Sequence, residues 1–174
     1  MDEGTATLTA SVIAALASIY QLIAGQDSEI RASNRKTLES NIHDLSECIH
    51  QTIATSNIIV KAKSNVGRIN WRAKATLAKN QLKLIRPKVR YSLWGIDNAL
   101  NRLSRFPDWI EHTIPYPVYS KKILFAGNML GEALDNCVRK CYLNGRTPRY
   151  YEILWIRFLS FRFNNQYQVF KNKK

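Results

Sequence analysis

Few side chains in this sequence can do acid–base or metal chemistry. The 174 residues include three histidines and three cysteines. His43 and His50 are seven residues apart, whereas paired zinc ligands on one helix recur at four, so we expect satisfied surface or core histidines. Cys137 and Cys141 are four residues apart, lack C-x-x-C spacing and are expected to be small buried residues. No P-loop, GxGxxG, HExxH or GxSxG pattern occurs. The sequence therefore predicts neither a metal nor a cofactor.

One arginine and one histidine have a spacing associated with catalysis. Arg105 and His112 enclose six residues in the stretch RFPDWIEH. This resembles the R-x(4–6)-H motif of HEPN domains, which are α-helical bundles. The resemblance implies an acid–base pair of the kind those ribonucleases use. His112 would move protons to and from the ribose 2′-hydroxyl and the 5′-oxygen, and Arg105 would stabilise the phosphorane charge. The alternative is a capping or core-packing role for both residues.

A long interval carries basic residues and no acidic ones. It lies between Glu47 and Asp97, contains ten Lys and Arg residues, and belongs to a chain of net charge +13. Because ion pairing within the interval cannot neutralise these charges, we expect a surface that contacts phosphate, in anionic lipid or in RNA. The alternative is pairing with acids elsewhere in the fold. The predicted contacts are Lys61, Lys63, Arg68, Arg72, Lys74, Lys79 and Lys83.

The elements that position these side chains are expected to be helices. Apolar residues recur at spacings of three and four, and no β alternation is found. We expect helices over about 27–64, 68–85, 90–105, 119–143 and 148–163, with breaks at Asn65 and Gly67, Pro87, Pro107 and Gly145. The predicted fold class is all-α, with a HEPN-like bundle of about five helices that follows an N-terminal transmembrane helix.

The first segment has no charged side chain from residue 4 to residue 26. About 20 helical residues span the roughly 30 Å apolar thickness of a bilayer. On a helical projection, large apolar residues gather on one side and small or hydroxylated residues on the other. The small side favours packing against copies of the same helix and could line a wet lumen. The predicted pore-lining or helix-packing residues are Thr7, Ser11, Ala14, Ser18 and Gln21.

Three alternatives for this segment are a lone anchor, a cleaved signal peptide and a buried core helix of a bundle. Membrane orientation follows from the flanking charges. Two acids precede the span, and Arg31, Arg35 and Lys36 follow it, which places the body in the cytoplasm. Cysteines without a framework pattern fit a reducing compartment. We therefore predict a transmembrane or pore helix at 1–26 and a basic cytoplasmic helical domain at 27–174.

An anchor, a basic helical body and the Arg105–His112 pair together resemble the small membrane accessory protein of type VI-B CRISPR systems, over the full chain. That family works beside an RNA-guided, RNA-cleaving effector. The resemblance implies a homo-oligomeric pore in the bacterial inner membrane that enhances antiviral defence by depolarisation. Its partners would be membrane lipid and RNA or the effector, and the Arg–His pair would be structural or subunit-contacting. The two alternatives are a membrane-tethered HEPN ribonuclease and a non-enzymatic adaptor that binds RNA or a partner protein.

Overall fold

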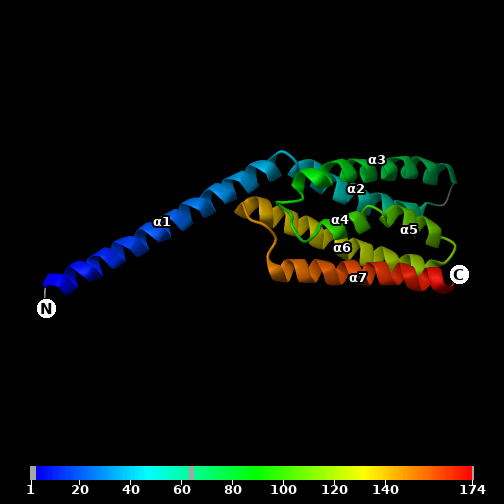
Figure 1. Ribbon diagram of the computed structural model, residues 1–174. Coiled ribbons are helices and arrows are strands. Elements are labelled where there is room, and N and C mark those ends of the chain that lie inside the picture. Colours follow the sequence, from blue (N-terminus) through cyan, green and yellow to red (C-terminus); the bar gives the residue numbers. More distant parts are fainter. Residues whose placement is uncertain (1–2, 63–64, 174) are drawn as a thin grey trace.

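The described part of the chain is built from helices alone, which confirms the all-α prediction (Figure 1). The computed structural model describes the backbone of residues 3–62 and 65–173, and their side chains except at 3–15, 22–24 and 65–67. The elements are α1 (Glu3–Glu39), α2 (Ile42–Lys61), α3 (Asn65–Val89), α4 (Asp97–Leu103), α5 (Phe106–Thr113), α6 (Pro117–Asn144) and α7 (Tyr150–Lys173).

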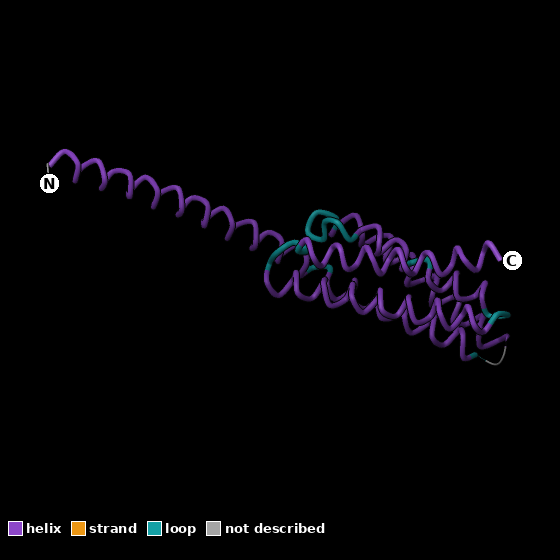
Figure 2. The backbone as a smooth tube through the Cα atoms, turned by 90° about the horizontal axis from the view of Figure 1, so that it is seen from below, coloured by secondary structure: helices purple, strands orange, loops and turns teal. Residues whose placement is uncertain are grey.

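Helices α2 to α7 form an elongated bundle, and most of α1 projects from one end of it (Figures 1 and 2). Helix α6 lies at the centre, packed against both α2 and α7, while α3 packs on α2. Phe106 and Phe163 are fully buried and meet edge to face, with their ring centroids 5.3 Å apart. Trp109 stacks on Tyr167 at 4.5 Å. Aromatic contacts of this kind join α5 to α7 across the core.

Two glycines let neighbouring elements approach α6 closely. A Cβ atom on Gly127 would overlap the ring of Phe106, and one on Gly131 would overlap the side chain of Ile53. Both glycines are buried. Helix α6 therefore has two flat positions, one that receives α5 and one that receives α2.

The first break in helical structure falls later than the sequence predicted. We expected a separate helix from Asp27 to about Ser64, but α1 runs unbroken to Glu39. No glycine or proline interrupts 27–39, and the chain turns instead at Ser40 and Asn41. The hydroxyl of Ser40 and the amide of Asn41 both donate to the carbonyl oxygen of Thr37, at 3.1 and 3.0 Å. These side chains satisfy the exposed carbonyl at the helix end and so terminate α1.

The predicted helix over 90–105 is also wrong in its first half. Helix α3 continues through Pro87 to Val89, and a loop follows before α4 begins at Asp97. The reason is Gly95, whose φ of +87° is a left-handed conformation that glycine adopts readily. At the other end of the chain, α7 extends beyond residue 163 to Lys173, because Phe170 is buried and continues its packed face.

Candidate membrane-contacting end of the bundle

The projecting half of α1 presents large apolar side chains to solvent. Leu16, Ile19 and Tyr20 are 61%, 56% and 74% exposed. Because apolar surface is driven out of water in proportion to its area, an exposed row of this kind calls for lipid or a protein partner. This row lies within the uncharged stretch of residues 4–26.

The described contacts of α1 with the bundle fall on its last turns. The hydroxyl of Ser92 donates to the Asn34 side-chain oxygen at 3.4 Å, and the guanidinium of Arg35 donates to the carbonyl of Leu143 at 2.9 Å. Leu38 is fully buried. Close approach of the Arg31 backbone to Gly145 completes the junction, since a Cβ on Gly145 would lie 2.7 Å from the Arg31 carbonyl oxygen. Helix α1 is thus fixed to the loops at one end of the bundle.

Within the described side chains, no helix has a segment of sufficient length and hydropathy to cross a membrane. Most of the predicted anchor lies outside them. Of the predicted helix-packing residues, Thr7, Ser11 and Ala14 fall in the undescribed part, while Ser18 and Gln21 are exposed on α1. The transmembrane assignment accordingly stays a prediction.

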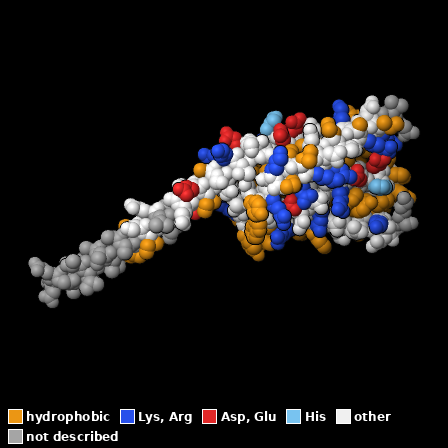
Figure 3. Space-filling view, turned by 45° about the horizontal axis from the view of Figure 1, so that its top comes forward, with side chains coloured by type: hydrophobic (Ala, Val, Ile, Leu, Met, Phe, Trp, Pro, Cys, Tyr) orange, Lys and Arg blue, Asp and Glu red, His pale blue; other side chains and the backbone are white. Residues whose placement is uncertain are grey.

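Exposed aromatic and basic side chains lie at the end of the bundle that α1 joins. They come from the α3–α4 loop, the α6–α7 connection and the start of α7, and Figure 2 shows loops gathered at this end. In Figure 3, Lys, Arg and hydrophobic side chains lie along the lower edge of the bundle near α1. We call this set the collar: Tyr91, Trp94, Leu143, Tyr150 and Tyr151, with Arg31, Arg35, Arg90, Arg149 and Arg157.

The collar could not be read from the sequence, because it is assembled from segments far apart in the chain. Tyr91 is 86% exposed and Trp94 is 63% exposed, yet both lie within two residues of Ser92, which is buried and donates to Asn34 of α1. The available signal was the density of aromatic and basic residues at 149–158. That density gave no indication that the 90–95 loop would lie beside it.

The basic stretch between Glu47 and Asp97 is partly neutralised by acids that follow it in sequence. Three ion pairs join α3 to α4 and α5: Arg72 with Glu111, Lys79 with Asp108, and Arg86 with Asp97 at 2.7 Å. The acids belong to the segment that folds back along α3. Pairing with acids elsewhere in the fold, the alternative given by the sequence, accounts for these three cations.

The other predicted phosphate contacts have varied surroundings. The guanidinium of Arg68 donates to the carbonyl of Ala62 at 3.0 Å, and the Lys74 ammonium lies 4.4 Å from the ring centroid of Trp71. Lys61 and Lys83 are exposed, and Lys63 lies outside the described residues. Of the six predicted cations that the structure describes, Arg72 and Lys79 therefore pair with acids of α5, and phosphate contact stays a prediction.

Arg105 and His112 lie at opposite ends of α5. Arg105 caps the start of α5 without a side-chain cap hydrogen bond, and His112 lies in the last turn of the same helix. Seven residues of helical rise separate them by about 10 Å along the axis. Both side chains are exposed, and His112 Nδ1 donates to the Asp108 carbonyl at 2.7 Å. The acid–base role of the pair therefore stays a prediction.

The first two histidines also have separate partners. His50 Nε2 lies 3.3 Å from a carboxylate oxygen of buried Asp135, which also pairs with Arg139 at 2.8 Å. His43 lies 3.9 Å from Glu47. The two imidazoles therefore do not form a shared metal site within the described part of the chain.

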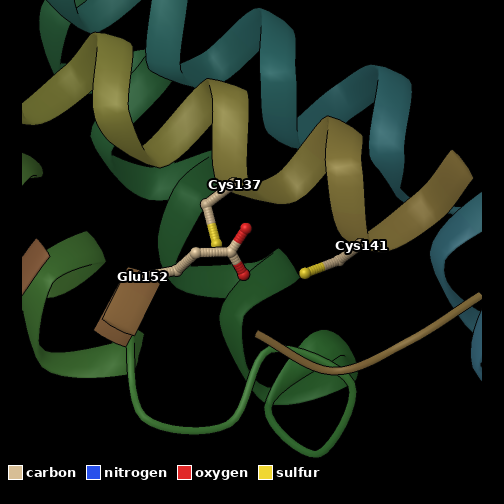
Figure 4. A group of neighbouring side chains, drawn as sticks. All are labelled: Cys137, Cys141 and Glu152. Atoms are coloured by element: carbon tan, nitrogen blue, oxygen red, sulfur yellow. The ribbon is translucent and has the colours of Figure 1, made fainter. Parts of the chain in front are cut away.

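Cys137, Cys141 and Glu152 form a compact buried group between α6 and α7 (Figure 4). Their potential ligand atoms lie within 4.8 Å of one another. The carboxylate, however, accepts hydrogen bonds from both terminal nitrogens of Arg146, each at 2.8 Å, and from the Arg149 backbone N–H. A hydrogen bond to Cys141 and burial raise the pKa of the Cys137 thiol. The group therefore closes the α6–α7 turn around the Arg146–Glu152 ion pair, in which Nε of Arg146 is buried without a hydrogen-bond partner.

Comparison with known proteins gives no family. No family model matches the chain, and neither a curated protein nor a solved structure matches it significantly. A functional assignment therefore depends on the geometry of the collar, α1 and the bundle.

Proposed function

We propose that the protein is a single-pass component of the bacterial inner membrane, with the uncharged half of α1 in the bilayer and the α2–α7 bundle in the cytoplasm. The collar is the observation that carries this proposal. Trp and Tyr concentrate at the membrane–water boundary, and Lys and Arg concentrate on the cytoplasmic flank of a span. The bundle presents both kinds of side chain at the end that α1 joins.

The exposed apolar row on α1 supports the same proposal. A helix satisfies its own backbone hydrogen bonds and can enter hydrocarbon without exposing polar backbone groups. Leu16 and Ile19 would then leave water, whereas the charged residues from Asp27 onward would stay outside. Tyr20 has a polar tip that can reach other helices or the boundary region.

Copies of the chain associate through α1 in this proposal. The small or hydroxylated side of the segment, from Thr7 to Gln21, permits close helix approach and interhelical hydrogen bonds. A ring of such helices would turn that side inward and enclose a polar path. Depolarisation through this path is the defence activity implied by the resemblance to the type VI-B accessory protein, and the collar would hold each bundle at the membrane surface.

The anchor is tested by fractionation of cells that express the full chain. The wild type is expected in the membrane pellet after alkaline carbonate extraction, and an Ile13→Lys plus Ile19→Lys variant is expected in the supernatant. Leu77→Lys is the matched control, because Leu77 is 58% exposed but lies on α3. Wild-type protein that carbonate releases from the pellet would refute the anchor.

A further inference from the structure

A hollow within the collar is lined by two guanidinium groups and a tryptophan. It measures about 210 Å³ and is bounded by Arg90, Trp94, Gly95, Asp97, Asn98 and Arg157. The residues come from the α3–α4 loop, the start of α4 and α7. A water molecule in the liquid occupies about 30 Å³, so the hollow has room for a phosphate group.

Gly95 brings the two sides of this hollow together. Its left-handed conformation turns the loop toward α7, where an added Cβ would lie 2.8 Å from the Cδ1 atom of Ile153. Ile153 is buried, so the loop is held against the first turn of α7. Arg90 and Arg157, 67 positions apart in the chain, consequently face one hollow.

The charge of the hollow is positive in spite of its one acid. Asp97 accepts hydrogen bonds from Nε and Nη2 of Arg86, at 3.0 and 2.7 Å, and Arg86 also donates to Asn101 at 2.9 Å. The Asp97 charge is therefore matched by Arg86. Arg90 and Arg157 remain as the cations that face the hollow, and guanidinium groups bind phosphate oxygens with paired N–H donors.

A second hollow of about 340 Å³ lies next to the first and shares Arg90 and Asp97 with it. Lys83, Pro87 and Tyr91 complete its lining with Arg86. Exposed Trp94 lines the first hollow and exposed Tyr91 lines the second, and Arg90 lines both. An aromatic ring beside paired cations suits a ligand with an apolar part and an anionic phosphate.

The site also lies at a suitable height above the proposed span. Ser92 donates a hydrogen bond to Asn34 of α1. Asn34 lies eight residues after Gln26, which is the last residue of the uncharged stretch. Eight residues of helix rise about 12 Å, and the headgroup layer extends roughly 5–8 Å beyond the hydrocarbon. Arginine and tryptophan side chains are long enough to bridge the remaining distance.

We infer that the hollow lined by Arg90, Trp94 and Arg157 binds the phosphodiester of an anionic glycerophospholipid headgroup. This inference rests on the proposed membrane anchor, because the anchor brings the collar to the headgroups. Trp94 would contact the glycerol and upper acyl region, while Arg90 and Arg157 hold the phosphate oxygens.

The test uses the full chain released from membranes in mild detergent with added phosphatidylglycerol, and counts bound lipid by native mass spectrometry. An Arg90→Gln plus Arg157→Gln variant is expected to retain at least tenfold less phosphatidylglycerol than the wild type. Lys121→Gln plus Lys122→Gln is the control. These two exposed lysines lie at the start of α6, at the far end of the bundle (Figure 1), and their loss is expected to change retention less than twofold. Unchanged thermal unfolding of the arginine variant shows that its bundle is folded.

Three further measurements distinguish the possible causes of a reduced phosphatidylglycerol retention. Phosphatidylcholine is expected to bind the wild type and both variants equally weakly. A short uridine oligonucleotide is expected to bind the arginine variant and the lysine control alike. If the arginine variant loses RNA binding but keeps its phosphatidylglycerol, the lipid assignment is overturned. Equal phosphatidylglycerol retention by the arginine variant and the wild type would also overturn it. Carbonate extraction of the wild type reports on the anchor independently, so failure of the headgroup site leaves that result intact.

Discussion

The Glu152 carboxylate accepts a hydrogen bond from each terminal nitrogen of Arg146, both at 2.8 Å. This buried pair joins the end of α6 to the first turn of α7. Glu152 is 8% exposed and also accepts the Arg149 backbone N–H, as the acid of a helix-capping box does. The pair thereby fixes the turn that places Tyr150 and Tyr151 in the collar.

Glu152→Gln is expected to lower the free energy of unfolding by about 3 kcal/mol at pH 7, because it leaves the buried Arg146 charge without its partner. The hydrogen bonds from Arg146 lower the pKa of Glu152 below its ordinary value of 4.5. A carboxyl group with a lowered folded-state pKa stabilises the fold above its unfolded-state pKa, and this contribution is lost as pH falls.

Wild-type stability should therefore decline as pH drops below about 4.5, and the variant should decline less steeply. Urea unfolding followed by circular dichroism at a series of pH values measures both effects. Glu132→Gln, on the exposed side of α6, is the control and should behave as the wild type. Equal stability of the Glu152 and Glu132 variants would contradict the structural role assigned to the pair.

Gly127→Ala is expected to destabilise the bundle by about 1–2 kcal/mol. The new methyl group overlaps the buried ring of Phe106, and overpacking costs roughly 1–3 kcal/mol, partly offset by the better helix propensity of alanine. The same exchange at Gly25 is the control, because nothing lies within 4 Å of an added Cβ there. Thermal unfolding of the two variants in detergent makes the comparison, and a Gly127 variant as stable as the wild type would show that α5 does not pack as described.

Ser11→Leu plus Ser18→Leu is expected to abolish ion conductance in planar bilayers while the chain stays in the membrane. The larger side chains would fill the small side of α1, on which the proposed pore depends. Ile19→Leu, on the large apolar side, should conduct as the wild type does. Undiminished current in the double serine variant would exclude lumen lining by this side of the helix.

Purified wild-type protein is expected to cleave RNA no faster than its His112→Ala variant. Arg105 and His112 are about 10 Å apart along α5, and the Nδ1 proton of His112 is engaged by the Asp108 carbonyl. Gel analysis of a labelled single-stranded RNA makes the measurement. Cleavage that the histidine variant lacks would support the ribonuclease alternative, with the pair completed between copies.

Several helices were predictable because their limits depend on local chemistry. Gly145 ends α6 in a left-handed conformation, as its position after a long apolar stripe indicated. Pro107 lies in the first turn of α5, where a backbone N–H would have no partner within the helix, so a proline costs no hydrogen bond there. The predicted interruption near 105–107 was therefore sound. The break at Ser40 and Asn41 was missed, because side-chain bonds to Thr37 end α1 there without any glycine or proline.

The sequence by itself determined an all-helical protein with an uncharged first segment and a basic body, because side-chain periodicity and charge are properties of neighbours in the chain. Only the tertiary structure decided which cations acquire acids and which lie at the end of the bundle that α1 joins. Arg72 and Lys79 meet acids of α5, whereas Arg90 and Arg157 line one hollow. The reason is physical: burial of Ile153 under Gly95 and of Leu38 under the bundle sets those neighbours, and such long-range packing leaves no local pattern.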